Sequence, residues 1–317
     1  MNNFWQNLPI PFTVLAPMDG VTDAVFRQII LKIGRPDVFF TEFTSCEGIM
    51  SPGREKVAES LKFNCNEQPI VAQIWGNNPE NFYKTSQFVK NLGFAGIDIN
   101  MGCPDKIVTK DGSCSALINN PTLAEQIIQA SKEGSGGLPI SVKTRIGTKG
   151  EQMEWISFLL EQKLSAIIVH LRTVEELSKV RAHWELMPKI IKLRNKISPK
   201  TLIIGNGDIT SLKEIEIKYK QYGCEGFMVG RGVLANPWMF SETIKNIGVE
   251  DRIKTFLDHI DIFDKTWGKD KNAENLKKFC KAYINNFKGA AVLRDRIMNV
   301  KSTVEFREII CSYLKTS

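Results

Sequence analysis

The alternation of eight short apolar runs with longer amphipathic stretches constrains the fold of this chain most. Most of these runs are continuously apolar in their first half, as expected for strands that are buried on both faces. They comprise Thr13–Met18, Val38–Phe43, Ile70–Trp75, Gly96–Asn100, Ile140–Arg145, Ala166–His170, Thr201–Gly205 and Gly226–Gly230. Strict alternation of strand and helix predicts a parallel sheet, and eight such units in about 240 residues predict an α/β fold of the (β/α)8 TIM barrel type.

The amphipathic stretches carry the usual signals of helix starts. Asn78 and Asn120 each precede a proline, which places an N-cap residue before proline at the first helical position. The other helical patterns span Asp23–Ile33, Glu151–Leu164, Trp184–Asn195 and Ser211–Tyr222. A doubly wound open sheet is the alternative, but no G-x-G-x-x-G motif follows the first run to support it.

The pattern changes after Phe240, where no further strand-like run occurs. Helical patterns follow at Arg252–Phe263, Asn272–Phe287, Ala290–Met298 and Val304–Lys315. We therefore predict a barrel domain over residues 1–245 and a small all-helical domain over residues 246–317. The chain has 317 residues and a net charge of +7, and residues 271–317 hold 10 basic and 4 acidic residues. This excess indicates either a solvated helix surface or a nucleic-acid contact.

The cysteines and the apolar runs exclude several classes of protein. The seven cysteines are odd in number and form no C-x-x-C pair, so neither a disulfide framework nor a metal site is predicted. The first residues lack the pattern of a signal peptide, and no stretch approaches 18 apolar residues, so we expect no membrane segment. Free thiols suit the reducing cytoplasm, and a monomer is the default expectation.

Polar residues follow the strands at the end where barrels carry their active sites. The last two runs lead into Gly205-Asn206-Gly207-Asp208 and Gly230-Arg231-Gly232, whose backbone N–H groups suit a phosphate. Lys143 interrupts an apolar run, which indicates either an anionic ligand or a structural ion pair, for example with Glu42.

His170 and Cys103 stand at two other strand ends. His170 is either a satisfied core histidine or a ligand, and its position two residues before Arg172 favours the ligand. A thiol beside a cofactor can move a proton, which makes Cys103 a candidate acid. The remaining cysteines lack such a setting.

Taken in order, these motifs resemble the tRNA-dihydrouridine synthases. The Asn100-Met101-Gly102-Cys103-Pro104 block is the most diagnostic, and the resemblance is close from residue 13 to about 240. The other matching segments are 15–23, 41–43, 71–74, 142–147, 169–173, 205–209 and 229–232.

The resemblance implies an FMN enzyme, reduced by NADPH, that reduces the C5=C6 bond of selected uridines in tRNA. A hydride from reduced FMN would reach uracil C6, Cys103 would protonate C5, and Asn100 would help to hold the ring. The implied cofactor-binding residues are Pro17, Met18, Asp19, Gln73, Lys143, His170, Asn206, Gly207, Asp208, Gly230 and Arg231. The implied tRNA contacts of the tail include Lys277 and Lys278.

The sequence departs from the family pattern in two places, which concern substrate selection. Gly112-Ser113-Cys114-Ser115 replaces a glycine-rich segment, and the role of Cys114 is open. Leu171 and the segment 174–182 replace a second family motif, so Arg172 or Arg181 is the candidate substrate-side cation, and Arg145 is a further candidate substrate contact. Two other functions stay open: a small-molecule FMN oxidoreductase of the dihydroorotate or dihydropyrimidine dehydrogenase type, and a non-catalytic RNA-binding protein.

Overall fold

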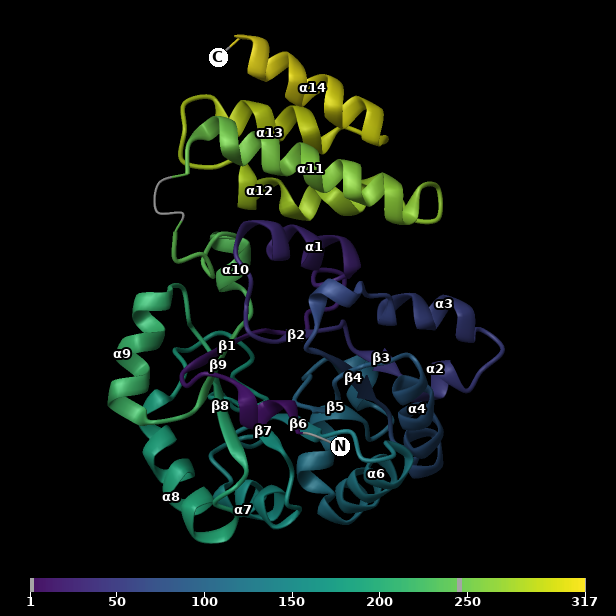
Figure 1. The fold of residues 1–317 in the computed structure, drawn as a ribbon, viewed down its shortest axis with the longest axis vertical. Coiled ribbons are helices and arrows are strands. Elements are labelled where there is room, and N and C mark those ends of the chain that lie inside the picture. Colours follow the sequence, from purple (N-terminus) through teal and green to yellow (C-terminus); the bar gives the residue numbers. More distant parts are fainter. Residues whose placement is uncertain (1–2, 244–246, 317) are drawn as a thin grey trace. The chain divides into compact units, whose positions relative to one another are not determined.

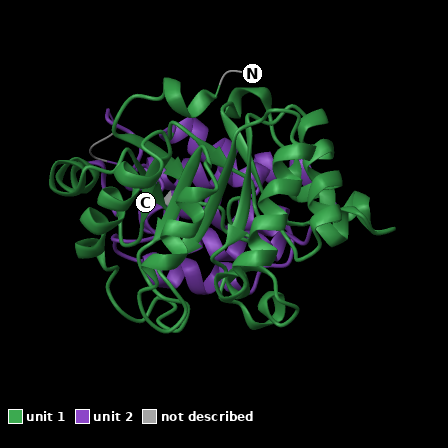
Figure 2. Cartoon of the chain, turned by 90° about the horizontal axis from the view of Figure 1, so that it is seen from below, with its two compact units in different colours: residues 1–22, 36–209, 213–230 green, residues 23–35, 210–212, 231–317 purple. Residues whose placement is uncertain are grey.

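The computed structural model describes residues 3–243 and 247–316, and these residues form two compact units. The first unit comprises Met1–Thr22, Pro36–Ile209 and Lys213–Gly230, and the second comprises Asp23–Arg35, Thr210–Leu212 and Arg231–Ser317 (Figure 2). The predicted domain boundary between residues 245 and 246 lies outside the described residues.

The first unit is built on a ring of parallel strands with helices around it (Figure 1). The strands run in the order β1-β9-β8-β7-β6-β5-β4-β2, with β3 paired to β4. Their bounds are β1 Phe12–Leu15, β2 Phe39–Phe40, β3 Thr44–Ser45, β4 Ile70–Trp75, β5 Gly96–Met101, β6 Ile140–Arg145, β7 Ala166–His170, β8 Leu202–Asn206 and β9 Gly226–Val229. A parallel bridge between Val14 and Val38 joins the two ends of this path. The predicted TIM-barrel class is confirmed.

The helices that connect these strands begin where the capping signals predict. Asn78 caps the helix over Pro79–Asn91, and Asn120 caps the helix over Pro121–Gly134, each through its side-chain oxygen. The connecting helices are α2 Cys46–Ile49, α3 Arg54–Ala58, α4 Pro79–Asn91, α5 Lys106–Thr109, α6 Pro121–Gly134, α7 Met153–Glu161, α8 Met187–Ile197 and α9 Leu212–Tyr222. Short 3-10 segments add Glu59–Leu61, Cys65–Glu67, Cys114–Asn119 and Trp184–Leu186.

An N-terminal segment contributes to the barrel core. A 3-10 turn over Phe4–Asn7 buries Trp5, whose ring lies 5.9 Å from that of Phe12 and 6.4 Å from that of Phe40. Inward-facing residues of the strands complete this cluster, among them Val14, Val71, Ile168, Ile204 and Met228. Three polar residues, Gln73, Asp98 and Ser141, are also fully buried within the strands, where they hydrogen-bond to one another.

The second unit is all-helical and includes α1 (Ala24–Ile33), the helix that follows the first strand. Phe26 on α1 stacks on Phe279 at 4.8 Å, and Lys32 pairs with Asp258 at 2.5 Å. The other elements are α10 Gly232–Ala235, α11 Val249–Trp267, a 3-10 segment Ala273–Phe279, α12 Cys280–Tyr283, α13 Ala290–Met298 and α14 Thr303–Thr316.

An aromatic core holds these helices together. Phe256 stacks on Tyr283 at 5.1 Å and meets Phe306 edge-on at 6.0 Å. The Tyr283 hydroxyl lies 2.9 Å from Nδ1 of His259, and burial, with the charge of Lys278 adding to it, lowers the pKa of His259 to about 3. Across the described helices, none combines the length and the apolar character needed to cross a membrane.

Candidate active site

A continuous hydrogen-bonded chain runs from the barrel interior to Cys103. Asp98 accepts from Ser141 Oγ at 2.6 Å and from Gln73 Nε2 at 2.7 Å. Gln73 Oε1 in turn accepts from Asn100 Nδ2 at 3.1 Å, and Asn100 Oδ1 accepts from the backbone N–H of Cys103 at 3.0 Å. The parallel register aligns Gln73 with Asp98, so these bonds follow from strand pairing. This series of hydrogen bonds fixes the turn that carries the Cys103 thiol.

Asp98 belongs to this hydrogen-bond network but is not among the predicted site residues. Asp98 is fully buried, and burial raises the pKa of its carboxyl to about 7 although Ser141 and Gln73 donate to it. Asp98 is a charged residue within an apolar strand, and the same pattern in the sequence indicated Lys143 as a candidate.

The thiol of Cys103 is partly exposed and has an unusual environment. A hydrogen bond from Cys114 is the main cause that lowers the pKa of Cys103 to about 7, and the Asp105 backbone N–H and Lys143 act in the same direction. Cys114 is fully buried at a left-handed φ of 56°, and the backbone N–H of Ser115 donates to the Cys103 carbonyl at 3.3 Å. The same interaction raises the pKa of Cys114, so Cys103 is the more acidic thiol of the pair.

Lys143 stands beside this turn, because its register partner on β5 is Asn100. Burial is the main cause that lowers the pKa of Lys143 to about 8, and the charge of Arg145 adds to the effect. Lys143 makes no ion pair with any residue that the structure describes, and the Glu42 carboxylate instead accepts from the Gly20 N–H at 2.6 Å. The alternative of a structural ion pair between Lys143 and Glu42 is therefore not realised.

Arg145 is buried and bonded to the chain itself. Its Nε donates to the Gly102 carbonyl at 2.9 Å, and its Nη1 donates to the carbonyls of Thr173 at 2.8 Å and Leu177 at 3.0 Å. Burial lowers its pKa to about 10, still well above neutrality. Arg145 thus ties the Cys103 turn to the segment that follows β7.

Arg172 is also internal. Its side chain is 3% exposed, its Nη2 donates to both oxygens of Asp208 at 2.6 Å, and its Nη1 lies 3.0 Å from Nε2 of His170. By contrast, Arg181, the other candidate substrate-side cation, is exposed.

The remaining predicted cofactor residues lie at the ends of β1, β8 and β9. Pro17 and Met18 are partly buried and Asp19 is exposed. Asn206 is buried and its Nδ2 donates to the Met228 carbonyl at 2.8 Å. Gly207 has a φ of 132°, and a Cβ there would lie 2.7 Å from Ala182 Cβ, so only glycine fits.

Gly230 and the basic residues of the second unit complete the predicted set. A Cβ at Gly230 would meet only ordinary contacts, 3.7 Å from Ala16 and 3.8 Å from Met18 Sδ. Arg231 is exposed and belongs to the second unit. In that unit Lys277 pairs with Glu274 at 3.0 Å and Lys278 is exposed.

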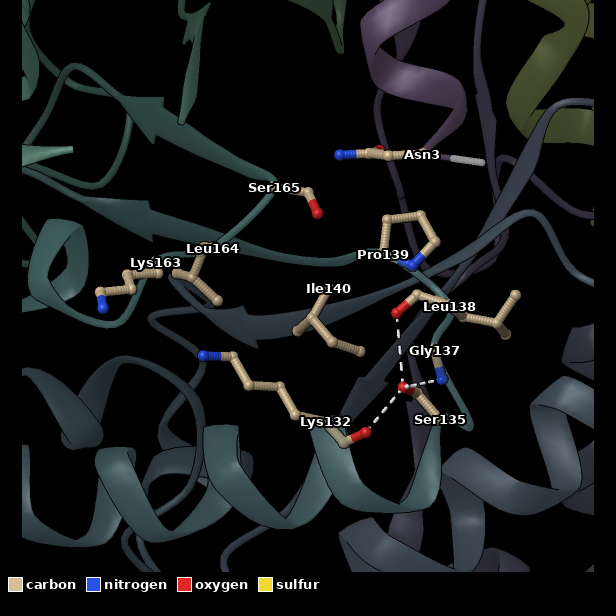
Figure 3. A pocket seen from close by; sticks show the side chains of 10 residues that line it. All are labelled: Asn3, Lys132, Ser135, Gly137, Leu138, Pro139, Ile140, Lys163, Leu164 and Ser165. Atoms are coloured by element: carbon tan, nitrogen blue, oxygen red, sulfur yellow. Dashed lines mark hydrogen bonds between the residues drawn. The ribbon is translucent and has the colours of Figure 1, made fainter. Parts of the chain in front are cut away.

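One cavity of about 260 Å³ lies away from these residues (Figure 3). Residues at the starts of β6 and β7 line it, at the end of the strands opposite Cys103. Lys132 also lines it, and the Lys132 amine donates to the Gln162 carbonyl. Lys132 belongs to the last turn of α6, but its amine and Lys163 both lie next to the C-terminus of α7, where cations interact favourably with the helix dipole. The cavity contains none of the predicted site residues.

The carboxyl ends of the strands fit a flavin, and Lys143 is the residue that indicates this. A reduced flavin carries negative charge near N1 and the C2 carbonyl, and Lys143 is a cation, largely withdrawn from water, that no described carboxylate pairs. No group of three side chains suited to a metal ion occurs in the described part of the chain.

Comparison with known proteins places the chain among its relatives. The family model described as "Dihydrouridine synthase (Dus)" matches residues 14–316. The chain belongs to the dihydrouridine synthase family. It is 46% identical over 316 residues to "Probable tRNA-dihydrouridine synthase 2" of Bacillus subtilis (strain 168), covering 97% of this chain and 95% of that protein. It is 44% identical to a "Probable tRNA-dihydrouridine synthase" of Staphylococcus epidermidis (strain RP62A), covering 98% and 96%. The predicted family is confirmed.

This member of the dihydrouridine synthase family is also similar in fold to solved structures. Morphinone reductase in complex with tetrahydroNAD aligns with a TM-score of 0.52 and 13% identity, covering 73% of this chain and 86% of that chain. The old yellow enzyme homologue of Zymomonas mobilis aligns with a TM-score of 0.52 and 12% identity, covering 77% and 94%. These likenesses show the fold. Family membership makes the protein an oxidoreductase that works with a flavin and a nicotinamide nucleotide.

Proposed function

We propose that this protein is an FMN-dependent, NADPH-reduced tRNA-dihydrouridine synthase that reduces the C5=C6 bond of specific uridines in tRNA. The observation that carries the proposal is the Cys103 thiol, held at the carboxyl end of the barrel beside Lys143 with a pKa of about 7. A general acid works best when its pKa lies near the operating pH.

Residues of this protein would have separate roles at the substrate. Bound reduced FMN supplies the hydride for uracil C6. Cys103 gives its proton to C5, which prevents negative charge from accumulating at C4–C5, and the hydrogen bond from Cys114 stabilises the thiolate left behind. The side-chain Oδ1 of Asn100 accepts from the backbone N–H of Cys103 and so fixes where the thiol lies.

The proposed flavin site uses residues from several strand ends. Lys143 would bind near N1 and the C2 carbonyl, where it holds positive charge in a poorly hydrated place. His170 and Gln73 would hydrogen-bond the polar ring edge. Pro17, Met18 and Asp19 would support the ring, and Asn206, Gly207, Asp208, Gly230 and Arg231 would form the phosphate cradle, although Asp208 is already engaged by Arg172.

The tRNA contacts are proposed on charge. A uridine must leave its stack to reach a thiol set in a barrel rim, and the remaining phosphates need a basic surface. The excess of basic residues in 271–317 supports Lys277 and Lys278 in that role, and the exposed Arg181 supports a substrate-side cation in the first unit. A tRNA substrate also implies a cytoplasmic protein, and the monomeric state stays a prediction.

Dihydrouridine formation on tRNA tests the proposal directly. Purified full-length protein with FMN and NADPH is incubated with tRNA from a strain that lacks this gene, and dihydrouridine is mapped by position. Cys103→Ala should abolish the product while FMN binding persists, and Cys224→Ala, another free cysteine of the first unit, should leave both unchanged. Turnover of dihydroorotate or free uracil, with none on tRNA, would instead establish the small-molecule oxidoreductase.

A further inference from the structure

The buried guanidinium of Arg172 donates hydrogen bonds to other groups of the protein. Its Nε donates to the Val180 carbonyl at 2.8 Å, and its Nη2 donates to both carboxylate oxygens of Asp208 at 2.6 Å. With 3% of its side chain exposed, Arg172 has almost no surface with which to contact a substrate. We therefore infer the role of Arg172 from the residues that it contacts.

The fourth contact of Arg172 fixes the proton of a neighbouring histidine. Nη1 of Arg172 lies 3.0 Å from Nε2 of His170. A guanidinium stays protonated and carries only donors, so Nε2 of His170 has to accept. An accepting Nε2 bears no proton, and the neutral imidazole therefore carries its proton on Nδ1. A proton on Nε2 would place two N–H donors against each other.

Asp208 extends the same arrangement to the segment after β7. Its carboxylate accepts from the Ala182 N–H at 2.8 Å, while the Val180 carbonyl accepts from Arg172. Both backbone neighbours of Arg181 are thus held by one ion pair. Asp208 adopts a left-handed φ of 50°, a strained backbone for a residue other than glycine, and the ion pair holds its carboxylate in this conformation.

We propose that Arg172 is a positioning residue, which fixes His170 as the Nδ1–H tautomer and, with Asp208, holds the Val180–Ala182 segment. Its relevance to catalysis rests on the proposed function, in which His170 donates a hydrogen bond to the flavin. The oxygens and unprotonated nitrogens of a flavin ring are acceptors, so the Nδ1–H form supplies the partner they need. Arg172 then acts on the reaction through His170.

Nitrogen NMR of histidine decides the tautomer without any activity measurement. The chain has only three histidines, so protein labelled with 15N-histidine gives few signals, and a His170→Asn variant identifies those of His170. In the flavin-free full chain at neutral pH, Nε2 of His170 should lack a proton and Nδ1 should carry one. A proton on Nε2 of His170 overturns the proposal, whatever any variant does.

A matched pair of variants separates positioning from mere stability. Arg194 is also buried and pairs with a carboxylate, Glu225, at 2.6 Å, and it donates to the Thr201 carbonyl at the opposite end of the strands. Arg172→Met and Arg194→Met should therefore lower the melting temperature to a similar extent. Only Arg172→Met should let the His170 proton distribute between both nitrogens, and only it should weaken FMN binding, by about tenfold for one lost hydrogen bond.

The outcomes distinguish this proposal from the proposed function. An unchanged His170 tautomer in folded Arg172→Met, or an equal loss of FMN affinity in Arg194→Met, refutes the positioning role. If wild-type protein fails to bind FMN, the proposed function fails, while the NMR measurement still decides the tautomer. If Arg172→Met does not fold, the wild-type spectrum alone decides.

Discussion

Replacing Cys114 with glycine should change the acidity of Cys103 without disturbing the fold. Glycine accepts the left-handed φ of 56° at this position more readily than cysteine, so the substitution removes the thiol and relieves backbone strain together. The hydrogen bond from Cys114 is the main cause of the low pKa of Cys103, about 7 against an ordinary 9.0. Without it, the pKa should return to about 9.

The size of the effect follows from this shift. At pH 7 the thiolate fraction of Cys103 would fall from about one half to about one hundredth, roughly 50-fold. A thiolate of higher pKa is intrinsically more nucleophilic, by about eightfold over two pKa units, so alkylation at pH 7 should slow about sixfold. Above pH 10 the variant should react faster than the wild type. The midpoint of the pH–rate profile is therefore the decisive quantity.

Alkylation by iodoacetamide, read by mass spectrometry of the peptide that contains Cys103, measures this midpoint. Cys65 and Cys311 are exposed, so both are replaced by serine in every protein compared. Cys114→Ser keeps a hydroxyl donor and should keep most of the low midpoint, whereas Cys224→Ala, remote from the turn, should not move it. A folded Cys114→Gly protein with its midpoint still near 7 would refute the reasoning, because other groups would then set the acidity.

Three further predictions concern buried and surface charges. Lys143→Met should raise the stability of flavin-free protein at pH 7 by roughly 3 kcal/mol, since a desolvated cation is removed, and should weaken FMN binding; thermal melting and flavin fluorescence measure the two effects. Asp98 has a folded pKa of about 7, above its ordinary 3.8, so its stabilising contribution is complete below pH 3.8 and is lost as the pH rises through 7. Urea unfolding should show wild-type protein losing roughly 3 kcal/mol relative to Asp98→Asn between pH 5 and pH 8, and parallel pH profiles would contradict this. Reversing Lys277 and Lys278 to glutamate should weaken tRNA binding and lower its salt slope by about 2, while Lys84→Glu on α4 should not.

Local sequence signals located the strands and the helix starts well. Ile70–Trp75, Ile140–Arg145 and Ala166–His170 are strands with the predicted bounds, because strands buried on both faces give continuous apolar runs. Capping by Asn78 and Asn120 is equally local, since the cap bonds lie within three residues. The second run differs: it contains only Phe39–Phe40 as a regular strand, and its start at Val38 bridges to Val14.

The sequence also determined the family and the candidate acid, because the order of motifs along the chain requires no coordinates. Only the tertiary structure decided how these side chains are used. The arginines at positions 145 and 172 carry the same charge as Arg181 in the sequence, yet the structure buries the first two against carbonyls and a carboxylate. Likewise, α1 follows a barrel strand but packs Phe26 on Phe279, more than 200 residues away. Partners this distant are chosen by packing and strand register, which no local pattern encodes.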